Sequence, residues 1–201
     1  MLSFNGNKII TTSVGGALIV NSELIKNKAI FLATQSRDDA PHYEHSEIGY
    51  NYQMSNICAG IGRGQMEVLD NHVSLRRKMH DFYIDLFKDI KGITVFTVPN
   101  ANYFSNYWLS TITIDSQLIN GIDREAIRLA FEAANIECRP LWKPMHLQPI
   151  FEKYPYYGAN VSSTLFEKGL CLPSGSNLTE DERARIKKVV NQLFNPLVIT
   201  G

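Results

Sequence analysis

A lysine near the start of the chain, Lys8, stands between a turn signal and a run of β-branched residues. The turn signal is Asn-Gly-Asn at residues 5–7, and the run is Ile-Ile-Thr-Thr at residues 9–12. Asn and Gly tolerate positive φ angles, so this turn lets a ligand approach the backbone N–H groups closely. β-branched residues favour extended backbone, which predicts one strand at 9–12 and a second at 17–20. The pattern therefore predicts a hairpin-like unit that holds Lys8 at a strand–turn junction.

Two interpretations of Lys8 are open at this point. The ordinary one is a solvated surface charge, because lysines are almost never fully buried unless they are paired. The other is a nucleophilic amine, which must be neutral for part of the time and therefore needs burial or a neighbouring cation. A Walker-type phosphate loop is excluded, because Ile9 follows the lysine and the Gly-x-x-x-x-Gly-Lys-Ser/Thr spacing is absent. The Ser3 hydroxyl and the N–H groups of the turn are suited to binding a phosphate.

Residues 3–12 resemble the cofactor-lysine segment of the DegT/StrS family, the pyridoxal-phosphate-dependent aminotransferases of nucleotide sugars. The resemblance rests on Ser-Phe-x-Gly-x-Lys followed by Ile-Ile-Thr-Thr and glycines. It implies that Lys8 is the catalytic lysine that binds pyridoxal phosphate, and that Ser3 contacts the cofactor phosphate. Relatives that dehydrate sugars carry histidine at the lysine position, so Lys8 implies transamination. The sequence departs from the family at Val14, where glycine is usual.

A second stretch, Gly-Tyr-Asn-Tyr-Gln-Met-Ser at residues 49–55, also resembles this family. In the family it precedes a helix of small residues at the dimer interface, and its asparagine reaches the cofactor phosphate of the neighbouring subunit. The resemblance therefore implies that Asn51 binds the cofactor and that the protein is a homodimer. Without the resemblance, Asn51 is interpreted as an ordinary turn or cap residue. At Gln53 the family usually has arginine, so the role of that cation is not transferred to this chain.

Three glycines interrupt the helix that is expected after this stretch. They are Gly60, Gly62 and Gly64, and the helical pattern around them is formed by Met54, Ile57, Cys58, Ile61 and Gln65. A glycine inside a helix costs about 1 kcal/mol relative to alanine. Three glycines in five residues therefore predict a partner that packs closely against this helix.

The composition excludes several classes of protein. The 201 residues include 20 Lys plus Arg and 20 Asp plus Glu, so no net charge favours nucleic acid or an anionic membrane as a partner. No apolar stretch approaches the roughly twenty residues that span a bilayer, and no leader peptide is expected. Three cysteines without a Cys-x-x-Cys pair predict neither a disulfide framework nor a zinc site, and favour a cytoplasmic protein.

A metal interpretation is possible for His42 and His45, which are close together in a polar segment. No third Cys or His lies nearby in the sequence, so two solvated loop histidines are the better interpretation. We therefore expect no metal site.

The periodicity predicts the elements of the chain in order. In the first part we expect a helix at 23–34, a loop at 35–45 and a long helix at 70–91 that Gly92 terminates as its C-cap. A domain boundary is placed there. In the second part we expect strands at 93–98, 108–114 and 170–172, an extended segment at 137–142, a helix capped by Asp123, a short helix at 162–168, and a last helix opened by a capping box of Thr179 and Glu182.

Residues 138–148 concentrate functional side chains on a loop that contains two prolines. Arg139, Lys143 and His146 are suited to a diphosphate, and Trp142 to packing against a sugar or a base. The segment resembles the family's Arg-Pro-Leu-Trp-Lys-x-Met-His, which leads from the small domain towards the substrate cleft. Structural roles remain an alternative for Trp142 and Pro144.

The resemblance implies an α/β fold, namely the C-terminal part of a fold-type-I pyridoxal-phosphate-dependent transferase. Residues 1–92 would be part of the large domain and residues 93–201 the small α/β domain. In the family the lysine lies near the middle of a longer chain, so the sequence is expected to match the C-terminal half. The predicted function is transfer of an amino group from an amino-acid donor to a nucleotide-linked keto-sugar, for a surface polysaccharide or glycan. The alternative is a non-catalytic dimerising fragment, because the other half supplies the carboxylate at the pyridine nitrogen.

Overall fold

The computed structural model describes the backbone of residues 1–198 and the side chains of residues 1–194. The chain divides into two compact units, Met1–Asp70 and Asn71–Gly201. This division differs from the boundary predicted at Gly92, because the helix before it, α3 (Leu69–Phe87), places its buried face in the core of the second unit. The last three residues of the predicted domain 93–201 lie outside the described residues.

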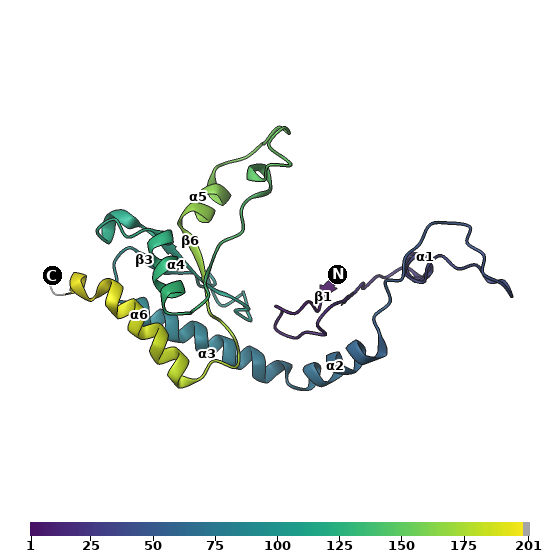
Figure 1. Cartoon of the computed structure of the whole chain (residues 1–201), viewed down its shortest axis with the longest axis horizontal. Coiled ribbons are helices and arrows are strands. Elements are labelled where there is room, and N and C mark those ends of the chain that lie inside the picture. The colour runs from purple at the N-terminus through teal and green to yellow at the C-terminus, as the bar shows by residue number, and fades with distance from the viewer. Residues whose placement is uncertain (199–201) are drawn as a thin grey trace. The chain divides into compact units, whose positions relative to one another are not determined.

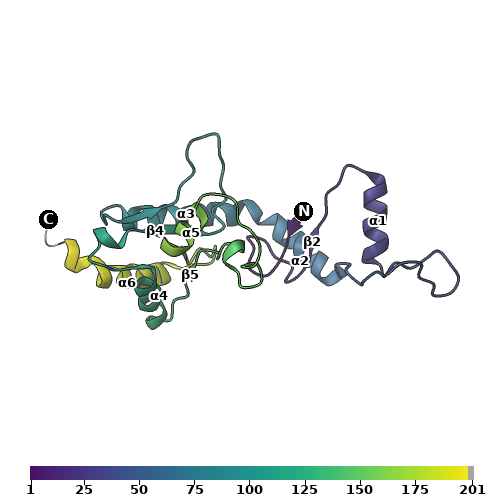
Figure 2. The same cartoon turned by 90° about the horizontal axis from the view of Figure 1, so that it is seen from above.

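The first unit contains two short strands and two helices. Strand β1 (Leu2–Ser3) pairs antiparallel with β2 (Gly16–Ala17), and these are followed by α1 (Glu23–Ala33) and α2 (Asn56–Glu67). A long loop without helix or strand follows α1, as predicted (Figure 2). The hydroxyls of Ser22 and Ser55 accept hydrogen bonds from backbone N–H groups in the first turns of α1 and α2, at 3.4 and 3.2 Å. The helix expected at 23–34 is thus confirmed.

The strands of the first unit are not those that the sequence predicts. Residues 9–12 belong to no strand, although all four are β-branched, and pairing occurs instead between Leu2–Ser3 and Gly16–Ala17. The hydrogen bonds of residues 9–12 go to other partners, described below, so their β propensity is overridden by the loop in which they lie.

Very little of the first unit is buried. Ile10, Thr12 and Ser36 are its buried residues, and neither α1 nor α2 buries a side chain. Apolar residues of α1 such as Leu24 and Ile25 are exposed. The hydrophobic core of the chain belongs entirely to the second unit, so the first unit has no comparable core of its own.

The second unit is built on a four-stranded antiparallel sheet in the order β3-β4-β6-β5. Its strands are β3 (Ile93–Val95), β4 (Ser110–Ile114), β5 (Arg139–Pro140) and β6 (Gly169–Leu172). Ile112 pairs with Leu170 at the centre of the sheet, and both are fully buried. Alternate residues of β4 are buried, which is the pattern of a strand with one face on a core. The sheet confirms the predicted strands: β3 ends earlier than predicted, β4 starts later, and β6 starts one residue earlier.

Three long helices pack against the buried face of this sheet. They are α3, α4 (Arg124–Ala133) and α6 (Glu180–Val198), and Figure 1 shows α6 running alongside α3. The shorter α5 (Val161–Lys168) contacts β4 and β6, and two 3₁₀ turns lie at Ser116–Leu118 and Met145–Leu147. The core formed by the sheet and the long helices consists of Met79, Tyr83, Phe87, Ile93, Ile112, Ile114, Ile119, Ile127, Phe131, Cys138, Leu170, Leu172, Ile186, Val189, Val190 and Phe194.

The predicted N-terminal caps of α4 and α6 are confirmed. The Asp123 carboxylate accepts a hydrogen bond from the Ala126 N–H at 2.8 Å at the start of α4. At the start of α6, the Glu182 N–H donates to the Thr179 hydroxyl at 3.3 Å, and the Thr179 N–H donates to the Glu182 carboxylate at 2.8 Å. The predicted C-cap at Gly92 is wrong, because α3 ends at Phe87 and Gly92 lies in the turn before β3 with φ +95°.

A buried histidine of α3 predicts acid sensitivity of the second unit. His80 is 1% exposed, its ring stacks on Tyr107 at 3.6 Å between centroids, and within the described part of the chain neither ring nitrogen has a hydrogen-bond partner. Burial lowers the pKa of His80 below its usual 6.5, and among its charged neighbours Arg77 lowers this pKa while Asp81 raises it. The folded chain therefore keeps His80 neutral at a pH where the unfolded chain protonates it.

We expect the free energy of unfolding to fall as the pH drops below about 6.5, by at most about 1.4 kcal/mol per pH unit for this one proton. Urea unfolding at pH 7.5, 6.5 and 5.5 measures the effect. His80→Phe keeps a ring against Tyr107 and removes the proton site, so it should flatten the dependence. An equally steep dependence in the variant would assign it to other groups.

Candidate functional site

Lys8 lies on a closed loop whose two ends meet at Phe4. The Phe4 N–H donates to the Gly15 carbonyl at 3.0 Å, and the Phe4 carbonyl accepts from the Thr12 N–H at 2.9 Å and from the Thr11 hydroxyl at 3.2 Å. Within the loop, the Lys8 N–H donates to the Asn5 carbonyl at 3.0 Å, which closes the predicted Asn-Gly-Asn turn. The backbone that carries Lys8 is therefore fixed by hydrogen bonds at the base of the loop. In this article "the Lys8 loop" means residues 4–15.

The three residues predicted to bind the cofactor all lie in the first unit. Lys8 is half-buried, whereas Ser3 at the end of β1 and Asn51 are exposed. Asn51 forms an isolated β-bridge with Thr34, which joins the end of α1 to the segment before α2. Asn51 therefore joins two distant segments through a β-bridge, whereas the sequence without the resemblance suggests a turn or cap residue.

The chemistry of these side chains fits part of pyridoxal phosphate. An aldehyde reacts with an amine, which Lys8 supplies, and a phosphate accepts hydrogen bonds from donors such as a hydroxyl and an amide. Ser3 and Asn51 are both exposed, so their side-chain donors are accessible to a ligand. The half-buried environment of Lys8 also differs from that of a fully solvated surface lysine.

The residues predicted to bind the substrate lie in the second unit, in three separate environments. Arg139 on β5 pairs with Glu137 at 2.5 and 2.6 Å. Trp142 is 65% exposed, and its ring lies 6.0 Å from that of Trp108. The local sequence places all the predicted residues on one segment, but the structure does not gather their side chains around one cavity.

His146 is the most firmly held of these three side chains. Its Nε2 lies 3.0 Å from the Ser163 hydroxyl on α5, and its ring stacks on Tyr156 at 3.7 Å between centroids. Sequence analysis missed Ser163, Tyr156 and Trp108, because they lie outside residues 138–148 and share no motif with them. A single sequence carries no signal for such long-range pairs.

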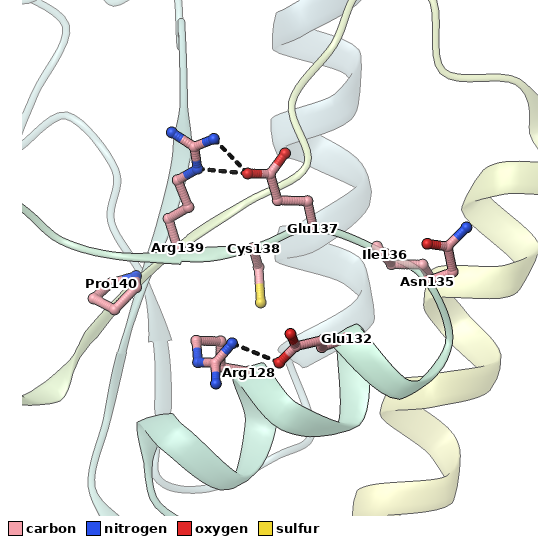
Figure 3. A pocket seen from close by; sticks show the side chains of 8 residues that line it. All are labelled: Arg128, Glu132, Asn135, Ile136, Glu137, Cys138, Arg139 and Pro140. Atoms are coloured by element: carbon pink, nitrogen blue, oxygen red, sulfur yellow. Dashed lines mark hydrogen bonds and ion pairs between the residues drawn. The ribbon is translucent and has the colours of Figure 1, made fainter.

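A cavity of about 540 Å³ lies between α4 and the segment leading into β5, and Figure 3 shows the residues that line it. Arg139 and Glu137 form one ion pair above it, and Arg128 and Glu132 form another below it at 2.7 Å (Figure 3). The Cys138 sulfur lies between the two pairs (Figure 3). Burial raises the pKa of the Cys138 thiol to about 12, so this thiol is protonated at neutral pH and is a poor nucleophile.

The pairing of the arginines limits what this cavity binds. Arg128 also pairs with Glu125 at 2.7 Å, and its contacts with both carboxylates raise its pKa above the usual value. Both arginines that line the cavity are therefore already neutralised by carboxylates. An anion that enters it must displace one of these pairs.

The two histidines considered as metal ligands are engaged by other groups. His42 Nε2 lies 2.9 Å from the Glu44 carboxylate, and His45 Nδ1 lies 2.9 Å from the Gln35 carbonyl. Over residues 1–198, no cluster of three or more His, Cys, Asp or Glu side chains is placed to hold a metal ion. Within the same residues, no helix has both the length and the apolar character needed to cross a membrane.

Comparison with known families gives a match over almost the whole chain. The model of the DegT/DnrJ/EryC1/StrS aminotransferase family matches residues 1–193. This match includes the Lys8 loop, the Asn51 segment and residues 138–148.

Curated relatives match the chain over nearly all of its length. A Bacillus subtilis protein named "Putative pyridoxal phosphate-dependent aminotransferase EpsN" is 46% identical over 99% of this chain and 51% of its own length. The GDP-perosamine synthase of Vibrio cholerae is 31% identical over 96% of this chain and 52% of its own. The dTDP-4-amino-4,6-dideoxy-D-glucose transaminase of Shigella dysenteriae is 27% identical over 96% of this chain and 52% of its own length. The chain thus spans about half the length of the curated relatives it matches.

Solved structures also match nearly all of this chain over about half of their own length. The aminotransferase TlmJ of Streptoalloteichus hindustanus superimposes with a TM-score of 0.84 at 21% identity, over 98% of this chain and 52% of that one. Helicobacter pylori PseC, an aminotransferase involved in pseudoaminic acid biosynthesis, superimposes with a TM-score of 0.81 at 19% identity. The match covers 96% of this chain and 52% of that one. These likenesses confirm the expected fold class, a mixed α/β chain with the fold of about half a sugar aminotransferase.

Proposed function

Because the chain belongs to the DegT/DnrJ/EryC1/StrS aminotransferase family, we propose that it is the C-terminal half of a pyridoxal-phosphate-dependent aminotransferase. The reaction is transfer of an amino group from an amino acid to a nucleotide-linked keto-sugar. One observation carries the proposal: Lys8, which the resemblance of residues 3–12 assigns to the family's cofactor lysine, lies half-buried on a loop closed by hydrogen bonds at its base. The names of two relatives, a GDP-perosamine synthase and a dTDP-amino-sugar transaminase, support this class of substrate.

Each residue of the proposed cofactor site has its own chemical role. Lys8 Nζ would hold the cofactor through its aldehyde and would move the proton at the α-carbon of the amino donor. The Ser3 hydroxyl would bind the cofactor phosphate, and the Asn51 amide would bind the cofactor phosphate of the neighbouring subunit. When bound, pyridoxal phosphate supplies the electron sink that amino-group transfer requires. The closed loop contributes orientation, since a fixed backbone at Lys8 restricts where its amine reaches.

The proposed substrate residues are Arg139, Trp142 and His146. Trp142 presents a largely exposed ring, which suits stacking against a base or a sugar. His146 is held by Ser163 and Tyr156, so its remaining ring nitrogen has a defined direction. Arg139 would exchange its partner Glu137 for a diphosphate, which makes its contribution depend on breaking that ion pair.

We also propose that the protein is a homodimer in the cytoplasm. The dimer is supported by the family resemblance of the segment before α2, and by the apolar side chains that the first unit exposes. The cytoplasm is supported by three cysteines that are all free thiols. Sedimentation equilibrium measures the mass in solution, and cell fractionation measures the location. A monomeric mass at micromolar concentration would contradict the dimer.

The activity is tested with the purified chain, pyridoxal phosphate, glutamate and a GDP- or dTDP-linked 4-keto-6-deoxy sugar. Mass spectrometry of the nucleotide sugar detects the replacement of the carbonyl oxygen by an amino group. We expect this product only when both the donor and the cofactor are present. Cofactor binding without any product would favour the second candidate, a non-catalytic dimerising fragment, which the half-length match to the relatives supports.

A further inference from the structure

The Lys8 loop meets helix α2 at two specific points. The Thr11 N–H donates a hydrogen bond to the side-chain oxygen of Gln65, with a nitrogen–oxygen distance of 3.3 Å, although 54 residues separate the two in the sequence. One turn earlier on α2, Gly62 faces Thr12, and a Cβ added at Gly62 would lie 2.8 Å from the Thr12 methyl group. Both points are within the first unit.

Thr12 has little freedom to move away from α2. It is 2% exposed, its hydroxyl donates to the Val14 carbonyl, and its N–H donates to the Phe4 carbonyl. A β-branched side chain is also stiff about χ1. The absence of a side chain at Gly62 is therefore what allows Thr12 to approach the helix so closely.

An apolar cavity of about 260 Å³ lies beside these two points, and Thr12 and Gly62 belong to its lining. The lining also includes Ile10 from the loop, Met54 from the segment before α2, and Met66 from the helix. The Gln65 hydrogen bond and the Gly62 contact are two specific contacts that hold the loop on α2 at this cavity.

From these contacts we infer that Gln65 and Gly62 are positioning residues for Lys8, which set the register of the Lys8 loop on α2. The inference rests on the proposed function, in which Lys8 binds pyridoxal phosphate. Gln65 supplies the acceptor for a part-buried backbone donor of the loop. Gly62 supplies the space for Thr12. Neither residue needs to touch the cofactor, since both act through the backbone that carries Lys8.

Substitutions with matched controls test both the Gln65 hydrogen bond and the Gly62–Thr12 contact. Gln65→Leu removes the acceptor at similar volume, and Gln65→Glu keeps an acceptor oxygen at the same distance from the backbone. Gly62→Ala adds the methyl group that meets Thr12, whereas Gly60→Ala and Gly64→Ala add it where no atom lies within 4 Å. All three alanines raise helix propensity equally, so a difference among them reports the contact with Thr12.

Two readouts are measured on the full chain. The first is backbone hydrogen exchange of the Thr11 amide by NMR, with α6 amides of the second unit as an internal check of folding. The second is the yield of Lys8 labelled after incubation with pyridoxal phosphate and borohydride reduction, by peptide mass spectrometry. We expect Gln65→Leu and Gly62→Ala to speed Thr11 exchange at least about tenfold. Both variants should also lower the labelling yield severalfold, and Gln65→Glu, Gly60→Ala and Gly64→Ala should stay near wild type.

The outcomes separate this inference from the proposed function. If the wild-type chain labels Lys8 and Gln65→Leu changes neither readout, Gln65 is not a positioning residue. If Gly62→Ala behaves as Gly60→Ala does in both readouts, the role of Gly62 is overturned. A wild-type chain that shows no label at Lys8 overturns the proposed function, and with it the consequence for Lys8, whereas the Thr11 exchange rates still report whether α2 fixes the loop.

Discussion

Lys8→Ala is expected to lower amino transfer by at least about 10³-fold, because it removes both the amine that binds the cofactor and the base that moves the substrate proton. Lys8 is half-buried on a loop whose base is closed by backbone hydrogen bonds of Phe4, Thr12 and Gly15. The substitution leaves these backbone bonds in place, so folding should be largely retained. The measurements are the amino-transfer rate, and the visible absorption of the chain with pyridoxal phosphate before and after dialysis.

The matched control is Lys26→Ala. Lys26 belongs to the same unit, but it is exposed on α1, where it pairs with Glu23 at 2.9 Å. This control should keep wild-type absorption and rate, because an exposed ion pair contributes little. Equal absorption and equal retention of the cofactor in the Lys8 and Lys26 variants would rule out Lys8 as the cofactor lysine.

Phe131→Ala is expected to destabilise the chain by about 3–5 kcal/mol, because it removes a large side chain from a packed core. Phe131 on α4 is 0% exposed and belongs to the core formed by the sheet and the long helices of the second unit. A loss of this size is a large share of the stability of an ordinary domain. Urea unfolding followed by far-UV circular dichroism measures it.

The comparison for Phe131 is Leu129→Ala on the same helix. Leu129 is 50% exposed, so its truncation should cost well under half of the Phe131 value. Similar losses for the two variants would mean that α4 does not bury the face described here.

Local signals in the sequence predict the second unit well. A helix cap involves residues three apart, so Asp123 and the Thr179–Glu182 pair are recognisable without any knowledge of the tertiary structure. Burial of Ile127 and Phe131 follows from their spacing of four on an amphipathic helix. The early end of α3 at Phe87 is not visible in the same way, because the polar residues that follow are compatible with a further helical turn.

The first unit and the candidate site are less predictable, because their structure depends on partners far away in the sequence. The β-branched run at 9–12 suggests a strand, yet the Thr11 N–H donates to the Gln65 side chain and the Thr12 N–H donates to the Phe4 carbonyl. Among the described residues of this chain, close packing is seen at Gly62, whose partner Thr12 is 50 residues away in the sequence, whereas close packing of Gly60 and Gly64 against a second subunit stays a prediction. For His146 the motif identifies the residue, but its contacts with Ser163 and Tyr156 arise only in the folded chain.

Strand β5 forms one edge of the sheet, and its second residue is Pro140. The following residue, Leu141, donates its N–H inward to the Gly169 carbonyl. Successive N–H groups of a strand alternate in direction, so the nitrogen of Pro140 faces the open side. Proline has no N–H to offer there, and an added strand would lose a hydrogen bond at that position. At high protein concentration this edge therefore resists the growth of the sheet from one molecule into the next, which protects the protein against aggregation.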